Sequence, residues 1–360
     1  MSDQADAATS AASRPPTIRD VARVAGVSKS LVSLVFNGGE NVSEERRLRV
    51  EAAAEQLGYR PNLVAQSLSA GRRDLVAIFV SNLHNPLFAE IVGAAKARLA
   101  ESGQRTMIVS AQVDDGSGST VLDRDNLAVL QDLRPSGLIT VGTMPGFSEL
   151  ADLTATIPTV VASAIDATDD VIATVRSDDD AGINLVVAHL AGQGLQRIAF
   201  IGGAGGTVSA SREAAFRAAL VRHQLGVGWV ERADFTEAGA RRAVERMLTE
   251  NRIPQAIVAV NDLTAVGVIT ALEAAGVQVP RDCRVTGYDD TSLAAIPRIS
   301  LTSIDPDNRR IGREAAEALL SGGAGEVLIP PRLVVRASSV APAHRASADE
   351  THRAEVRMEE

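Results

Sequence analysis

The sequence predicts a small all-α unit with a helix-turn-helix plan, followed by a larger α/β unit containing two doubly wound parallel sheets. Residues 17–60 hold three short segments in which apolar residues recur at helical spacing between glycine-containing turns. From residue 74 onward, short apolar runs alternate with longer helical segments, which is typical of parallel sheets covered by helices. A chain of 360 residues that is 45% hydrophobic has room for two or three domains with sizeable cores.

The first unit begins with Thr17 and Asp20, whose spacing predicts a capping box in which Asp20 replaces the usual Glu or Gln. A glycine, Gly26, ends this helix after about two turns. Ser28 can cap a second helix and Ser43 a third. Helix, tight turn, helix and supporting helix form the helix-turn-helix plan, in which the second helix enters the major groove of DNA.

The second predicted helix carries polar residues that can meet base edges or phosphates. Lys29, Ser30, Ser33 and Leu34 lie on its polar side or border, and its start at Ser28 offers backbone N–H groups to a phosphate. Residues 17–73 hold nine Lys/Arg and six Asp/Glu, a net charge of +3, whereas the rest of the chain carries −12. This asymmetry favours nucleic-acid binding. The alternative is a plain three-helix bundle with a solvated face.

The stretch TIRDVARVAGVSKSLVSLVFNGGENVSEERRLRVEAAAEQLGYRPNLVAQSL resembles the DNA-binding headpiece of the lac repressor/galactose repressor (LacI/GalR) family. The shared landmarks are DVA-x-x-AGVS, VS-x-V-x-N, VS and LGY-x-PN, at family spacing. The family usually has Arg in the place of Leu34, where it reads a guanine. Because Leu can only make apolar contacts, we expect a different operator base there. The predicted DNA contacts are Thr17, Ser28, Lys29, Ser30, Ser33, Leu34, Asn37, Asn41, Tyr59, Asn62, Ala65, Gln66 and Leu68.

Residues 61–73, PNLVAQSLSAGRR, read as a helix of about three turns, which is marginal in water by itself. The resemblance implies a hinge that is unfolded off DNA and helical on the operator. Two such hinges of a dimer would enter the minor groove, and Leu68 of each would wedge into the central base step and kink the duplex. The alternative is that Leu63, Val64 and Leu68 pack onto the larger unit.

The larger unit reads as two repeats of the same strand–helix rhythm. Apolar strand-like runs lie at 75–81, 105–111, 137–142, 159–163, 197–203, 256–262 and 283–290, with a last strand within 328–339. Helical segments lie at 89–103, from about 120, and at 178–194, 211–226 and 264–277. Two doubly wound halves favour two lobes with a ligand cleft between them.

This unit resembles the family's effector-binding core, which is itself similar to periplasmic sugar-binding proteins. The matching motifs are Asn85-Pro86-Leu87-Phe88, Ser177-Asp178-Asp179, Ser209-x-x-Arg212, Val260-Asn261-Asp262 and Gly287-Tyr288-Asp289-Asp290. Candidate effector ligands stand where strands end, as parallel sheets favour. They are Ser81, Asn85, Phe88, Arg212, Phe235, Asn261 and Asp289. For each of them, a helix cap or a structural hydrogen bond is the alternative.

Each candidate has a chemical reason. The guanidinium of Arg212 can grip a carboxylate or neighbouring hydroxyls. Asn261 and Asp289 can hydrogen-bond sugar-like hydroxyls, and Phe235 matches an aromatic residue that stacks on the effector. Three departures from the family, Ser163, Leu263 and Asn308, leave open an effector that is not a simple sugar.

The sequence argues against an enzyme, a metal protein or a membrane protein. Cys283 is the only cysteine, and the five histidines form no ligand-spaced cluster. The run GGAGG at 202–206 lacks the Gly-Lys-Ser/Thr ending of a phosphate loop, and no Gly-x-Ser-x-Gly elbow occurs. The acidic run 178–180 is best interpreted as a helix start. Because no signal-peptide core and no long apolar run occurs, we expect a cytoplasmic protein. Because the motifs above are missing, we expect no cofactor, no metal and no catalytic residues.

We therefore expect a homodimeric regulator, interpreted as a repressor, that binds near-palindromic operator DNA and a carbohydrate-like effector. The expected organisation is a disordered tail at 1–16, a helix-turn-helix domain at 17–60, a hinge at 61–73, a periplasmic-binding-protein-like effector and dimerisation domain at 74–340, and a disordered tail at 341–360. The last segment contains no Leu, so no heptad seam for a tetramer is expected. The alternatives are a solute-binding protein and an enzyme on the same bilobal fold.

Overall fold

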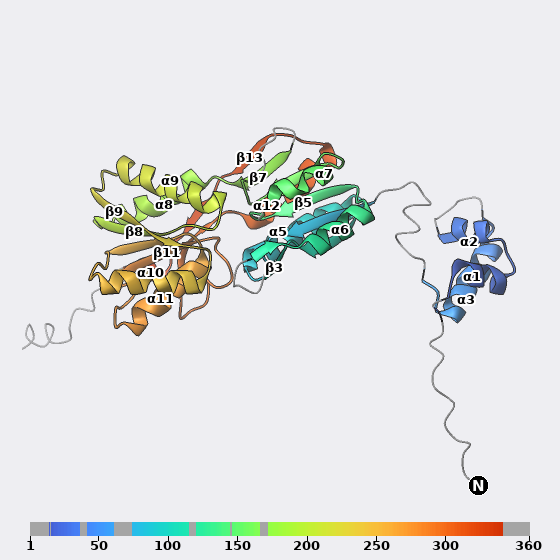
Figure 1. The fold of residues 1–360 in the computed structure, drawn as a ribbon, viewed down its shortest axis with the longest axis horizontal. Coiled ribbons are helices and arrows are strands. Elements are labelled where there is room, and N and C mark those ends of the chain that lie inside the picture. Colours follow the sequence, from blue (N-terminus) through green and yellow to red (C-terminus); the bar gives the residue numbers. More distant parts are fainter. Residues whose placement is uncertain are drawn as a thin grey trace, which may run out of the picture. The chain divides into compact units, whose positions relative to one another are not determined.

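The computed structural model describes residues 14, 16–36, 42–60, 74–114, 120–144, 146–165 and 172–340. Contacts divide the chain into two compact units, Met1–Asp74 and Leu75–Glu360 (Figure 1). Six predicted DNA contacts, Asn37, Asn41, Asn62, Ala65, Gln66 and Leu68, lie outside the described residues.

The first unit contains the three predicted helices, α1 (Ile18–Ala25), α2 (Lys29–Phe36) and α3 (Glu44–Leu57). The Asp20 carboxylate accepts hydrogen bonds from the N–H and Oγ1 of Thr17, at 2.9 and 2.7 Å. The Oγ of Ser28 accepts one from the N–H of Leu31 at 3.2 Å, so Ser28 caps α2 as predicted. The three helices bury Val21, Ala22, Ala25, Val32, Val35, Val50, Ala53 and Ala54 between them.

The prediction that the Ser43 side chain caps α3 is wrong. Ser43 occupies the position before α3, but its side chain makes no capping hydrogen bond. The helix start is instead stabilised by the charges of Glu44 and Glu45 in its first turn, where the helix dipole is positive.

The second unit has two lobes, and each is built on a six-stranded sheet (Figure 1). In the first lobe the strand order is β13 (Glu326–Ile329), β7 (Ala173–Ser177), β6 (Thr159–Ala162), β5 (Gly137–Val141), β1 (Leu75–Val80) and β2 (Arg105–Ser110). In the second lobe it is β14 (Arg332–Val334), β12 (Thr302–Asp305), β11 (Arg284–Tyr288), β10 (Ala256–Ala259), β8 (Arg197–Gly203) and β9 (Val227–Ala233). All neighbours pair in parallel except β14, which is antiparallel to β12. The predicted doubly wound architecture is confirmed.

Helices cover both faces of each sheet and build four apolar clusters. In the first lobe, α5 (Pro86–Glu101) and α12 (Asn308–Ser321) pack on one face, and α6 (Arg124–Leu133) and α7 (Ala151–Thr154) pack on the other. In the second lobe, α8 (Asp179–Ala191) and α9 (Thr207–Arg222) lie opposite α10 (Glu237–Thr249) and α11 (Asp262–Ala274). A hairpin of β3 (Gln112–Asp114) and β4 (Thr120–Leu122) and two short 3-10 helices, Phe147–Leu150 and Ala337–Ser339, complete the described elements.

Other predicted helices have ends that are shifted by up to four residues, and two predicted elements differ more from the structure. The last strand expected within 328–339 is divided by Pro330 and Pro331 into β13 and β14, which belong to different lobes. Proline has no N–H for a sheet, so the pair ends one strand and lets the chain change sheets. The helix expected from about Thr120 begins at Arg124, because Asp123 caps it by accepting from the N–H of Asn126 at 2.9 Å.

The described part of the chain passes between the lobes three times, after β7, after β12 and after β13. The two lobes are therefore joined by three connections. Among the described helices, none is long and apolar enough to cross a membrane.

Candidate functional site

A cleft of about 460 Å³ lies between the two lobes of the second unit. Most of its lining residues lie within three residues after the end of a strand, at the carboxyl edge where parallel sheets bind ligands. The first lobe contributes Ser81, Asn82, Asn85, Leu87, Phe88, Gln112, Thr120, Gly142, Thr143 and Ser163. The second lobe contributes Gly205, Val208, Arg212, Asp234, Phe235, Thr236, Leu263 and Asp289. The volume falls in the range of about 300–1,000 Å³ that is usual for small-molecule sites.

The cleft brings together six of the seven predicted effector ligands: Ser81, Asn85, Phe88, Arg212, Phe235 and Asp289. The seventh, Asn261, does not line it. Its side chain is buried and caps α11, because its Oδ1 accepts from the N–H of Thr264 at 2.9 Å. Its Nδ2 is buried without a hydrogen-bond partner among the described residues. In this conformation Asn261 therefore has the capping role that was the alternative.

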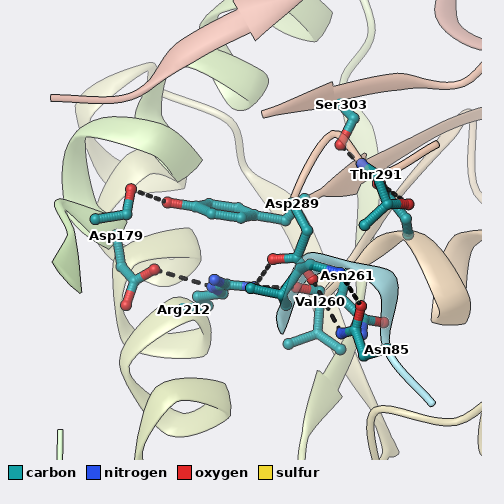
Figure 2. A network of polar contacts seen from close by, with 12 residues as sticks. Asn85, Asp179, Arg212, Val260, Asn261, Asp289, Thr291 and Ser303 are labelled. Carbon is teal, nitrogen blue, oxygen red and sulfur yellow. Dashed lines mark hydrogen bonds and ion pairs between the residues drawn. The ribbon is translucent and has the colours of Figure 1, made fainter. Parts of the chain in front are cut away.

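Arg212 is held by several groups at once (Figure 2). Its Nε donates to Asp179 Oδ1 at 2.9 Å, and its Nη1 donates to the carbonyl of Val260 at 2.7 Å and to Asp289 Oδ1 at 3.5 Å. The guanidinium also lies over the ring of Tyr288, 3.5 Å from its centroid. Burial by itself lowers the pKa of Arg212, but the two carboxylates outweigh it and raise that pKa. Arg212 is thus a fixed cation whose charge is already compensated.

The carboxylate of Asp289 is less well satisfied. It is buried and accepts from Asn85 Nδ2 at 3.4 Å and from Arg212 Nη1 at 3.5 Å, both long for hydrogen bonds. Burial raises the pKa of Asp289 to about 6. Since Asn85 belongs to the first lobe and Arg212 to the second, Asp289 links the lobes while keeping acceptor capacity for a ligand in the cleft (Figure 2).

The backbone at Asp289 is in a conformation that L-residues rarely adopt, with φ of 102°, and Asp290 follows with φ of 43°. Neighbouring polar groups hold this turn. Asn308 Nδ2 donates to the carbonyl of Asp289 at 3.1 Å, and the N–H of Asp290 donates to Ser303 Oγ at 3.1 Å. Asn308, which departs from the family pattern, therefore supports the turn from α12 of the first lobe.

A second buried acid, Asp262, holds the residues next to this turn. Its carboxylate accepts from the N–H and Oγ1 of Thr291 at 2.7 and 2.9 Å, and from Ser303 Oγ at 2.6 Å. Burial and the nearby Asp289 raise the pKa of Asp262 to about 8, although these three donors oppose the shift. The motif Val260-Asn261-Asp262 marked this region, but the sequence did not predict that Asp262 supports the Asp289 turn.

The roles of Asp179 and Tyr288 were not predicted from the sequence. Of the acidic run, Asp178 caps α8 through the N–H of Ala181 at 3.0 Å, whereas Asp179 is buried against Arg212. The hydroxyl of Tyr288 lies 3.0 Å from Ser177 Oγ, which is in the other lobe. Both residues belong to motifs that match the family, so the sequence contained a signal for them. Asp179 was interpreted as part of an acidic helix start, and Tyr288 as part of a buried strand.

The glycine run before α9 forms a tight loop at the cleft. Gly203, Gly205 and Gly206 all have left-handed backbones, with φ of 77°, 93° and 112°. A Cβ on Gly206 would lie 2.8 Å from Cγ2 of Thr143 in the other lobe, so glycine permits this close approach. The loop is fixed by Ser209, whose Oγ accepts from the N–H of Gly203 at 2.8 Å.

In the first unit, the predicted DNA-facing residues have different surroundings. Ser28, Lys29, Ser30 and Leu34 are exposed, and Leu34 exposes 41% of its surface although it is apolar. Thr17 and Ser33 are half-buried, as is Tyr59, whose ring centroid lies 5.8 Å from that of Phe36. The exposed residues thus form one end and one side of α2.

Comparisons with known proteins match both units. The family of bacterial regulatory proteins, lacI family, matches residues 17–62, and the periplasmic binding protein-like domain matches residues 187–339. The ribose operon repressor of Escherichia coli (strain K12) is 33% identical over 312 residues, which cover 84% of this chain and 92% of the repressor. The chain belongs to the LacI family of bacterial regulatory proteins. It is accordingly a DNA-binding transcriptional regulator with a small-molecule domain.

Two further relatives agree with this assignment. The lactose operon repressor of Escherichia coli (strain K12) is 32% identical over 336 residues, covering 91% of this chain and 92% of that repressor. A crystal structure of the lac repressor dimer bound to operator and the anti-inducer ONPF has a TM-score of 0.76 at 29% identity, covering 91% of this chain and all of that one. The recognition made from the sequence motifs is confirmed.

Proposed function

We propose that this protein is a cytoplasmic, homodimeric repressor that binds operator DNA and is controlled by a sugar-like effector held between its lobes, with no catalytic activity. One observation carries the proposal: a helix-turn-helix unit precedes a bilobal unit whose cleft collects six predicted effector ligands. Relatives named as repressors of the ribose and lactose operons support it.

The structure suggests how the cleft can influence DNA binding. Asp289 is contacted by Asn85 from the first lobe and by Arg212 from the second, so a ligand that binds this carboxylate changes the contacts between the lobes. A change in lobe angle would alter the spacing of the two DNA-binding units in a dimer. Effector and operator then bias the same equilibrium, and each changes the affinity of the other by the same factor.

The experiment that tests this proposal starts from the full chain and fragmented genomic DNA of its natural host. Selected fragments should bind far more tightly than random DNA, and an effector should shift that affinity. A solute-binding protein or an enzyme would select no fragment. Sedimentation at micromolar concentration should give about twice the 37.6 kDa chain mass, whereas a stable four-chain species would contradict the dimer.

Lys29→Ala and Ser30→Ala should weaken operator binding without destabilising the fold, because both side chains are exposed on α2. If the residue contacts a base, we expect the free energy of operator binding to weaken by about 1–3 kcal/mol. If it contacts a phosphate, we expect the slope of log affinity against log salt concentration to decrease by about one. Fluorescence anisotropy at several salt concentrations measures both. Glu51→Ala, exposed on α3, is the control. Unchanged affinity and sequence preference in both variants would place the reading surface elsewhere.

Effector affinity should fall as the pH drops below about 6, because Asp289 then becomes protonated and loses its strength as an acceptor. The groups that face this carboxylate are Arg212, Asn85, Asp179, Asp262 and Tyr288. Of these, Arg212 and Asn85 favour the ionised form, whereas Asp179 opposes it.

Calorimetric titrations at pH 5 and pH 7.5 measure this dependence. The control is Asp289→Asn, which should bind more weakly than the wild type at pH 7.5 and show little change between the two pH values. Equal wild-type affinity at both pH values would show that Asp289 does not meet the effector as a carboxylate.

A further inference from the structure

We propose that the cleft is built to reject anions, so that the effector is an uncharged or cationic polyhydroxyl compound and not a phosphorylated or carboxylated one. This inference rests on the proposed function and specifies the chemical class of its effector. It follows from the charged side chains that line the cleft and from the protein groups that these side chains already contact.

The charged side chains that line the cleft in the described structure are Arg212, Asp234 and Asp289. Arg212, the single cation among them, is 2.9 Å from Asp179 and 3.5 Å from Asp289. Its Nη1 also donates to the Val260 carbonyl at 2.7 Å. A guanidinium that recognises a phosphate needs donors and charge free for the ligand. Here Nε and Nη1 of Arg212 already donate to protein groups, and its charge is compensated by two carboxylates.

The carboxylates in and next to the cleft outnumber the cations. Asp179, Asp234 and Asp289 together carry three negative charges against the one positive charge of Arg212. Arg176 lies 3.7 Å from Asp179, but it is itself paired with Glu326 at 2.7 Å and so adds no net positive charge. A ligand anion would therefore bind beside a net negative charge of about two, which repels it.

The three internal segments of the second unit that lie outside the described residues add no positive charge. Residues 115–119, 145 and 166–171 contain no Lys, Arg or His. One feature favours an anion, namely the N-terminus of α9, where Gly206 provides no side-chain cap. A helix N-terminus is equivalent to roughly half a positive charge, which is smaller than the excess of carboxylate charge.

The same groups are suited to a ligand that donates hydrogen bonds. Asp289 accepts two long bonds, at 3.4 and 3.5 Å, and can accept shorter ones from ligand hydroxyls. Around it the lining offers Ser81, Gln112 and Thr143, which can both donate and accept. Two aromatic side chains, Phe88 and Phe235, come from opposite lobes and can lie against the apolar faces of a sugar ring.

The first test compares matched compounds on the full-length protein by melting temperature and calorimetry: ribose with ribose 5-phosphate, glucose with glucosamine and glucose 6-phosphate, and adenosine with its monophosphate. In any set where one member binds, we expect the anion to bind roughly 100-fold more weakly or worse. An anionic member that binds more tightly than its neutral partner would overturn the proposal.

The second test does not require that the panel contain the effector. A small-molecule extract of the natural host is passed over an anion-exchange resin, and each fraction is tested for its effect on operator binding. Activity in the unretained fraction supports the proposal, whereas activity in the retained fraction contradicts it. An extract without any activity before fractionation would instead defeat the proposed effector control itself.

A variant that lacks one carboxylate of the cleft tests whether this charge causes the preference for neutral compounds. Asp234→Asn should narrow the difference in affinity between neutral and phosphorylated partners, because it removes one negative charge from the lining. Asp180→Asn is the matched control, since Asp180 is an exposed carboxylate on α8 that does not line the cleft. If the ratio of affinities for the neutral and the phosphorylated compound is the same in the wild type, in Asp234→Asn and in Asp180→Asn, the charge in the cleft does not select the ligand.

Discussion

Arg212→Ala is expected to destabilise the protein by about 3–5 kcal/mol, the usual cost of removing one partner of a buried ion pair. The Arg212 side chain exposes 7% of its surface. Its loss leaves the buried carboxylate of Asp289 without its cation, and leaves Asp179 with Arg176 alone, at 3.7 Å. The variant also loses the contact with the Val260 carbonyl. Denaturant unfolding measures the change, and effector binding should be lost with it.

The destabilisation by Arg212→Ala should be larger at pH 8 than at pH 5. Without the guanidinium, the pKa of Asp289 rises further above its already raised value of about 6. The native variant then binds more protons than the unfolded chain, and its stability falls as the pH rises. A destabilisation that does not depend on pH would show that the buried charge is not its cause.

Arg217→Ala is the matched control for Arg212→Ala. Arg217 lies on the same helix and pairs with Glu213 at 2.9 Å, but its side chain is 56% exposed. Exposed ion pairs contribute about 0–1 kcal/mol. If both variants lose the same free energy of unfolding, the buried network around Arg212 is not stabilising.

The architecture could be predicted wherever a strand is a continuous apolar run. β1 and β10 are fully covered on both faces, and their sequences LVAIFV and AIVA show this directly. The apolar pattern did not mark β7, β9 and β12, whose sequences are ATVRS, VGWVERA and TSID. β9 is an edge strand, and the other two contain polar or charged residues, so none of them shows a long apolar run.

The sequence could predict which residues near strand ends reach the cleft. It could not predict which of their side chains contact one another. Arg212 could be expected at the cleft because it follows a strand–loop junction in a matched motif. That it is paired with Asp179, 33 residues earlier, and Asp289, 77 residues later, depends on how the sheets fold together. Local patterns carry no information about such distant pairs. The cap role of Asn261 likewise depends on the direction in which its side chain points.

Gly312→Ala is expected to cost about 1–3 kcal/mol or more through overpacking between α12 and α5. A Cβ at Gly312 would lie 2.2 Å from the carbonyl oxygen of Ile91 and 3.1 Å from the Cβ of Ala94. Because the first of these atoms is backbone within a helix, the side chains cannot simply rotate away and α12 must shift. α12 begins at Asn308, which bonds the Asp289 carbonyl, so effector affinity should fall as well.

Gly93→Ala, on α5 of the same pair of helices, is expected to change the free energy of unfolding in the opposite direction. Gly93 is exposed on α5, and no atom lies within 4 Å of the Cβ it would gain. Alanine in an open helical position should therefore stabilise the protein by about 0.5–1 kcal/mol. Thermal and denaturant unfolding of the two variants should move in opposite directions from the wild type. If Gly312→Ala is as stable as Gly93→Ala, the two helices can separate without loss, and the close contact at Ile91 does not hold the first lobe together.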